Sequence, residues 1–272
     1  MMNLLKKHTP TLFLLLFLCP ALYAQDIPLP EHPRPDFQRE QWQNLNGPWA
    51  FAFDPADEGI SEGWPEGNQD FDRSITVPFP WGSELSGVEN EADIAWYQRN
   101  ITVDSSWQGK RIFLTVGASD WETSIWLDGS LMGKHQGGYV PFSFELTDRM
   151  EAGDAHKLVI RVDDARRDFT LYGKQGYGNA RGIWQTIYLE ARGEDYLDAL
   201  HFTPDIDQES TGVTAYLAEK SEHDLTLRLI IKTPGEDLTQ SVVIPAGKGK
   251  VRFNIAVPEP RLWTLDDPYL YE

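Results

Sequence analysis

Cysteine is almost absent from this sequence. The single cysteine among 272 residues, Cys19, lies in an N-terminal segment with a basic start, a short apolar run from Leu12 to Leu18, and small residues up to Ala24. These features predict a signal peptide over residues 1–24, cleaved after Ala24, and an exported protein of the periplasm or the extracellular space. Lipid attachment at Cys19, which the large Leu18 disfavours, and a retained segment are the alternatives. The mature chain then has no disulfide and depends on a hydrophobic core.

Long apolar runs and positive charge are also scarce. The apolar run of the leader is too short to span a bilayer, so we expect no membrane association after cleavage. The chain has 24 Lys and Arg residues against 42 Asp and Glu residues, which gives a formal net charge of −18. An acidic surface repels phosphate backbones, and this excludes nucleic acid as a partner.

Several motifs of common active sites are missing. The sequence has no H-E-x-x-H run and the mature chain has no thiol, so we expect no zinc site or other metal. It has no Walker loop and no G-x-G-x-x-G run after a strand, so we expect no nucleotide and no other cofactor. The G-x-S-x-G elbow of serine hydrolases is absent too. No stretch between Trp42 and Arg192 sustains the apolar spacing of an amphipathic helix.

Alternating apolar residues dominate what is present. Short period-2 stretches separated by turn residues predict an all-β protein. We expect an extended, Pro-rich lead-in over residues 25–41 and a jelly-roll β-sandwich over residues 42–192. A smaller immunoglobulin-like β-sandwich over residues 193–272, incomplete at its C-terminus, is expected to follow. Two of its strands each have one apolar face: Leu225, Leu227, Leu229 and Ile231 on the first, and Val251, Phe253, Ile255 and Val257 on the second.

The stretch from Gly117 to Leu146 carries the densest pattern. An alternating strand ends at Leu127, and Asp128-Gly129 is a dipeptide that suits a tight hairpin turn. Gly137-Gly138 predicts a bend where a side chain would clash. The acidic stretch from Asp54 to Asp72 lacks periodicity, which predicts a loop.

This stretch resembles the N-terminal sugar-binding domain of glycoside hydrolase family 2, the β-galactosidase, β-glucuronidase and β-mannosidase group. The matching runs are Asp120-Trp121-Glu122-Thr123, Trp126-Leu127-Asp128-Gly129, Met132-Gly133-Lys134-His135 and Gly137-Gly138-Tyr139-Val140-Pro141-Phe142. Further family-like runs begin at Trp42, Phe79, Trp96, Gly182, Pro260 and Asp267. Asp128 departs from the family, which usually has Asn there, but both residues suit the turn.

The resemblance implies a galactose-binding-like jelly roll followed by an immunoglobulin-like domain, and it also implies what is missing. Members of the family hydrolyse glycosides with two glutamates on a (β/α)₈ barrel placed after these domains, and such a barrel needs about 250 residues. We therefore expect no catalytic residue in this chain. Its expected partners are a carbohydrate, either a β-glycoside or a plant polysaccharide fragment, and a catalytic barrel in cis or in trans. A free-standing carbohydrate-binding module and a structural remnant are the alternatives.

The resemblance also suggests residues that contact the sugar. In large β-galactosidases of the family an aspartate after one strand reaches the sugar, and the matching position is Asp164, or Asp163 if the alignment shifts. Lys174 and Gln175 resemble a run of secreted bacterial members, and both side chains donate to hydroxyls. Arg181 is a further candidate. For Asp164 the alternative is a solvated acid at a strand end, and for Lys174-Gln175 a structural loop.

Aromatic and histidine side chains at loop ends complete the predicted site. Trp81, Trp121 and Tyr139 present flat rings that suit stacking on a pyranose, although core packing is the common role of such residues. His135, placed by its neighbours in a Gly-rich loop, suits a hydrogen bond to a ligand or to backbone groups.

Overall fold

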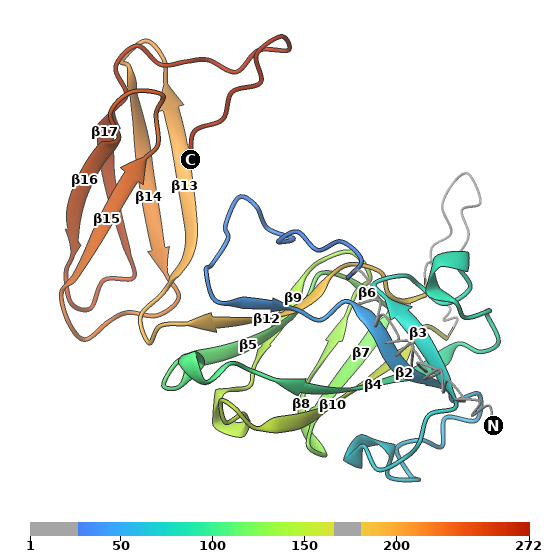
Figure 1. Cartoon of the computed structure of the whole chain (residues 1–272). Helices are drawn as coiled ribbons and strands as arrows, with labels where there is room; N and C mark the ends of the chain where they lie inside the picture. Colours follow the sequence, from blue (N-terminus) through green and yellow to red (C-terminus); the bar gives the residue numbers. More distant parts are fainter. Residues whose placement is uncertain (1–26, 166–180) are drawn as a thin grey trace, which may run out of the picture.

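The computed structural model describes residues 27–165 and 181–272, and their regular structure is β-strand with a few short 3₁₀ turns. Every strand pairing among them is antiparallel. The predicted all-β fold, a larger sandwich followed by a smaller one, is confirmed (Figure 1). Within these residues, no helix has the length and apolar character needed to cross a membrane.

One layer of the larger sandwich is a six-stranded sheet. Its order is β3-β2-β4-β10-β7-β8. The strands are β2 (Gly47–Phe53), β3 (Arg73–Val77), β4 (Ile94–Thr102), β7 (Glu122–Leu127), β8 (Ser130–Gln136) and β10 (Ala155–Asp163). In the central strand β10 the residues from Leu158 to Val162 are all buried, because both faces of the sheet are covered, and Arg161 among them pairs with Asp57.

The facing layer is a four-stranded sheet in the order β1-β12-β5-β9. Its strands are β1 (Trp42–Asn44), β5 (Arg111–Val116), β9 (Phe142–Glu145) and β12 (Ile187–Arg192). Two short strands, β6 (Ser119–Asp120) after β5 and β11 (Gly182–Ile183) before β12, pair with each other. Trp49, Phe51 and Tyr97 are at most 1% exposed in the core between the layers. Each large apolar side chain so buried contributes about 1.5–3 kcal/mol.

The loop over residues 54–72 covers the outer face of the six-stranded sheet. It contains a 3₁₀ turn, η1 (Trp64–Glu66), and the Trp64 ring lies 5.7 Å from that of Trp96, which stacks on Trp126 at 5.3 Å. Asp54 Oδ2 accepts a hydrogen bond of 2.9 Å from Trp96 Nε1. The predicted loop therefore carries a small aromatic core of its own.

The hairpin between β7 and β8 turns at the predicted Asp128-Gly129 dipeptide. Both residues have positive φ, 47° and 78°. Asp128 Oδ1 accepts a hydrogen bond of 2.7 Å from the Lys157 backbone N–H, and its Oδ2 lies 2.7 Å from Nδ1 of His156. Partial burial acts to raise the pKa of Asp128, but the hydrogen bonds from Lys157 and His156 hold it below the ordinary value.

Asp128→Ala is expected to lower the free energy of unfolding by about 1–2 kcal/mol, because it removes both hydrogen bonds and strains the positive φ. Asp128→Asn retains an acceptor and tolerates this φ, so it costs less. Since folding lowers the pKa of Asp128 below its ordinary value of 3.8, its contribution is complete above that pH and is lost as the pH falls from 3.8 through the lower pKa of the folded state. Urea unfolding at pH 7 and at about pH 2 measures both effects. A difference that stays constant with pH contradicts the assignment.

The smaller sandwich follows Arg192. A three-stranded sheet contains β13 (Leu197–Asp205), β14 (Ser210–Leu217) and β17 (Lys250–Ala256), and β15 (Leu225–Ile231) pairs with β16 (Leu238–Ile244). The predicted apolar faces of β15 and β17 are confirmed by the alternating burial of their residues. Val213, Ile231, Ile255 and Val257 form its core. This core is much smaller than that of the larger sandwich, so the domain depends more on its neighbour.

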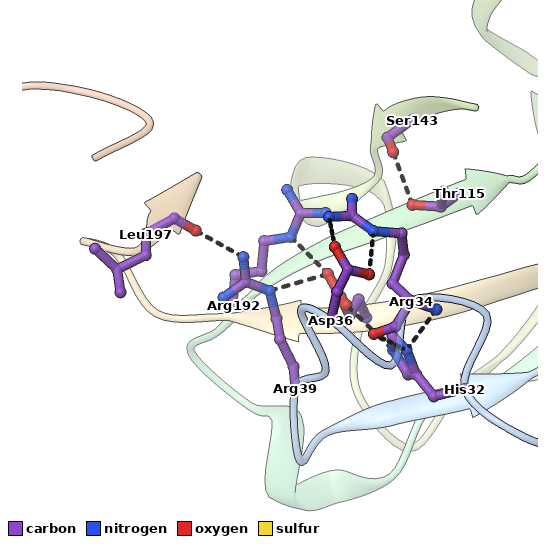
Figure 2. Close-up of polar contacts among 9 residues, drawn as sticks. His32, Arg34, Asp36, Arg39, Thr115, Ser143, Arg192 and Leu197 are labelled. Carbon is purple, nitrogen blue, oxygen red and sulfur yellow. Dashed lines mark hydrogen bonds and ion pairs between the residues drawn. The ribbon is translucent and has the colours of Figure 1, made fainter. Parts of the chain in front are cut away.

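A buried carboxylate, that of Glu190, joins the lead-in to the four-stranded sheet. Two of its partners, Arg39 and Arg192, are labelled in Figure 2. Glu190 is 3% exposed on the outer face of β12, and its Oε2 accepts hydrogen bonds of 3.1 Å from Arg39 and 2.9 Å from Arg192. His32 Nε2 lies 3.7 Å from Oε1. The lead-in is thus packed on the sheet, and Glu190 is the group that holds it there.

The same arginines reach the smaller sandwich. Arg39 Nη2 donates a hydrogen bond of 2.7 Å to the Leu197 carbonyl, and Arg111 pairs with Glu219 at 2.9 Å. The Tyr196 ring lies 5.1 Å from the Arg192 guanidinium carbon and 5.5 Å from that of Arg39. These contacts tie the start of β13 to the larger sandwich.

Candidate functional site

One end of the six-stranded sheet brings together most of the predicted sugar-contacting residues. Asp163, the last residue of β10, pairs with Ile94 of β4 and with Glu122 of β7. Glu122 in turn pairs with Gln136 of β8, and Asp120 pairs with Gly182. We call this end the rim and define it by these residues: Asp93, Asp120, Trp121, His135, Tyr139, Asp164, Arg181 and Trp184.

Asp164 and Arg181 contact each other on the rim. Arg181 Nε lies 3.4 Å from Asp164 Oδ2, and Arg181 Nη1 donates to Asp93 Oδ1. The Asp164 backbone N–H donates a hydrogen bond of 2.9 Å to the Asp93 carbonyl. The predicted pair of contact residues is therefore held together by charge. Arg181 is partly neutralised by two carboxylates, which leaves it suited to positioning Asp164.

The three predicted aromatic residues differ in exposure. Trp81 is 1% exposed, and its ring lies 6.0 Å from Phe51 and 6.3 Å from Tyr97, so it packs in the core and offers no face to a sugar. Trp121 is half-buried, and its carbonyl accepts a hydrogen bond of 3.0 Å from Gly137. Tyr139 is 80% exposed. Among the three, Tyr139 is the most exposed.

His135 lies in strand β8 and not in a loop, because pairing with β7 extends to Gln136. Its ring stacks on Phe142 with a centroid distance of 4.1 Å and an interplanar angle of 14°. The Gly-rich bend begins only at Gly137, which has a φ of 128°. Lys174 and Gln175 lie outside the described residues.

Two rim residues did not stand out in the sequence. Asp120 is half-buried, and burial raises the pKa of its carboxyl above the ordinary value. Trp184 Nε1 donates a hydrogen bond of 2.7 Å to the Gly138 carbonyl. Both residues belong to family-like runs. They come close together only because β6 pairs with β11, so the sequence alone could not predict that they are neighbours.

The rim suits hydrogen bonding to a polar ligand. It combines carboxylates, a partly neutralised guanidinium and an exposed aromatic ring, which are the groups that bind sugar hydroxyls and sugar faces. In the part of the chain that the structure describes, no group of three His, Cys, Asp or Glu residues has the arrangement to hold a metal ion.

Comparisons with known proteins identify the family and support the fold. The sequence model of the family described as "Glycosyl hydrolases family 2, sugar binding domain" matches residues 42–191. The chain is 26% identical over 253 residues to a β-glucuronidase of Paenibacillus borealis, covering 84% of this chain and 41% of that protein. It is 23% identical over 245 residues to a β-galactosidase of Thermoanaerobacter pseudethanolicus, covering 84% of this chain and 30% of that protein.

A solved structure shares the fold. The β-glucuronidase from Ruminococcus gnavus in complex with D-glucuronic acid superposes with a TM-score of 0.67 at 19% sequence identity, over 86% of this chain and 43% of that one. The chain thus spans well under half the length of these relatives, and the likeness reaches beyond the matched domain into the smaller sandwich.

Proposed function

Because the chain belongs to the glycosyl hydrolase family 2 sugar-binding domain family, we propose that it is the non-catalytic N-terminal part of an exported glycoside hydrolase. In this proposal the larger sandwich shapes the mouth through which a β-glycoside or a plant polysaccharide fragment enters. A (β/α)₈ barrel supplied in cis or in trans carries the two catalytic carboxyl groups, which in retaining enzymes lie about 5–5.5 Å apart.

The observation that carries the proposal is the coverage of the relatives. Similarity extends over 84% of this chain but over only 41% and 30% of two glycosidases. A chain that matches those enzymes in this way shares their sugar-binding architecture without the remainder of their length. The predicted leader over residues 1–24 supports export.

The proposal is tested by comparing two proteins on chromogenic β-galactosides, β-glucuronides and β-mannosides. The chain of 272 residues alone is expected to hydrolyse none of them. The product of the complete gene, or the chain mixed with a barrel encoded beside it, is expected to hydrolyse at least one. Hydrolysis by the purified chain alone, with contaminating enzyme excluded, contradicts the proposal, and so does a complete gene that encodes no barrel in either form.

Asp164→Asn in the active complex is expected to lower kcat/KM by about 10- to 100-fold, the effect of losing a hydrogen bond to a charged group. The stability cost is expected to be about 1–3 kcal/mol, since the Asp164 and Arg181 side chains are only 16% and 15% exposed and Asn removes the charge that pairs with Arg181. Asp148→Asn, an exposed acid in η4 (Thr147–Arg149), is the matched control. Equal kcat/KM for both variants removes Asp164 from the site.

A free-standing carbohydrate-binding module is the second candidate function, and the exposed Tyr139 favours it. This function predicts measurable heat when the isolated chain is titrated with plant polysaccharides. It further predicts that the heat is retained when no barrel is present in any form. A complete gene that encodes both the chain and a barrel, with hydrolysis that depends on both, contradicts it.

A further inference from the structure

The carboxylate of Asp120 is exceptional on the rim. Its neighbours Asp93 and Asp164 pair with Arg181, and Glu122 accepts a hydrogen bond of 2.7 Å from Gln136. Asp120 is half-buried, burial raises the pKa of its carboxyl, and no hydrogen bond or ion pair from the described residues offsets that burial. A carboxylate withdrawn from water without a partner costs free energy, so a purely structural role gives no reason to keep it.

The surroundings of Asp120 are shaped around this carboxylate. A Cβ placed on Gly138 would lie 2.6 Å from Cγ and Oδ1 of Asp120, so the second glycine of the bend is required by close approach. Its φ is not positive, unlike that of Gly137. Gly138 therefore lets the carboxylate lie directly against the backbone of the bend.

An aromatic pair, Tyr139 and Trp184, is also held at Gly138. The Gly138 carbonyl accepts the 2.7 Å hydrogen bond from Trp184 Nε1, which fixes the indole. The Tyr139 ring meets the Trp184 ring edge to face, with centroids 5.7 Å apart and planes at 68°. Tyr139 stays 80% exposed despite this contact. Tyr139 therefore presents an oriented, solvent-facing ring, and it is next in sequence to the glycine that lies against the Asp120 carboxylate.

We propose that Asp120, Gly138, Tyr139 and Trp184 form a subsite for one neutral pyranose unit of the glycan. This inference rests on the proposed function and adds residues and a ligand class to it. Hydroxyls of the sugar donate to the Asp120 carboxylate in charge-assisted hydrogen bonds, and the apolar face of the ring packs on Tyr139. Trp184 is a positioning residue that holds Tyr139 and Gly138 in place.

The ligand class follows from the charge at the subsite. A uronic acid brings a second carboxylate close to Asp120, and like charges at short distance oppose binding. Arg181 is the arginine among the rim residues, and it is already paired with Asp93 and Asp164. The subsite therefore favours a neutral sugar over a uronide.

The test is NMR titration of the chain with three probes: methyl β-D-galactopyranoside, methyl β-D-glucopyranoside and methyl β-D-glucuronide. We expect at least one neutral glycoside to shift the Trp184 indole N–H and Gly138 amide signals in a saturable way, and to bind at least five-fold more tightly than the uronide. Asp120→Asn and Tyr139→Ala are each expected to weaken that binding at least five-fold. Asp148→Asn and Tyr216→Ala, an exposed acid and an exposed aromatic residue elsewhere, are the matched controls.

Three results would overturn the inference: no saturable shift with either neutral glycoside, unchanged affinity in both rim variants, or equal binding of the uronide. These results are separate from the hydrolysis assay of the complete gene product. Hydrolysis without probe binding leaves the proposed function standing and removes the subsite. Probe binding that depends on Asp120, without hydrolysis by any complex, retains the subsite and removes the glycosidase assignment.

Discussion

Gly182→Ala is expected to lower the free energy of unfolding by about 3–4 kcal/mol, because it adds overpacking in the core to strain at a positive φ. A Cβ at this position would lie 2.2 Å from the Tyr97 hydroxyl oxygen and 2.3 Å from Cζ3 of Trp81. Both rings belong to the closely packed core and have no space into which to move. The backbone φ of 81° adds strain for any residue with a Cβ.

Gly247→Ala separates the two contributions. Gly247 has a φ of 75°, but no atom lies within 4 Å of a Cβ placed on it. Its cost is therefore the backbone strain alone, about 1 kcal/mol. Urea unfolding of both variants, followed by tryptophan fluorescence, measures the difference. Equal midpoints for the two variants would mean that Trp81 and Tyr97 yield easily and that the core at this end is loosely packed.

Local features of the fold were predictable because they depend on neighbouring residues. The Asp128-Gly129 turn is specified by two residues that tolerate positive φ, and the alternating face of β15 by a period of two. The role of Gly138 was not predictable in the same way. Adjacent glycines predict a bend. The group that requires the second glycine is the Asp120 carboxylate, which lies on another strand and is therefore not indicated by the local sequence.

The candidate site, too, was predictable in part. The resemblance made Asp164 and Arg181 separate candidates for contact with the sugar, and the structure places them in contact with each other. It gave no means to distinguish Trp81 from Tyr139, since both are aromatic residues at loop ends. One is 1% exposed and the other 80%, because β2 and β4 supply neighbours for Trp81 that no local pattern reveals. Exposure is a property of the assembled sheets.

Glu190→Ala is expected to lower the free energy of unfolding by about 2–4 kcal/mol and to release the lead-in (Figure 2). Removing one member of a buried ionic cluster leaves the remaining charges without compensation. Arg39 and Arg192 have side chains that are 19% and 14% exposed, so they recover only part of their hydration. Since Arg39 also donates to the Leu197 carbonyl, its displacement weakens the tie to the smaller sandwich.

Asp267→Ala is the matched control for Glu190→Ala, because Asp267 pairs with Arg261 at 2.7 Å with both side chains about half exposed, 47% and 48%. Such a pair is worth less than about 1 kcal/mol. Hydrogen exchange distinguishes a specific role from general destabilisation. In Glu190→Ala, the hydrogen-bonded amides of Arg34 and Phe37 in the lead-in are expected to lose protection at urea concentrations where β4 and β10 remain protected. Uniform loss of protection across the larger sandwich would mean that Glu190 supports the whole fold, and that the lead-in has no independent attachment there.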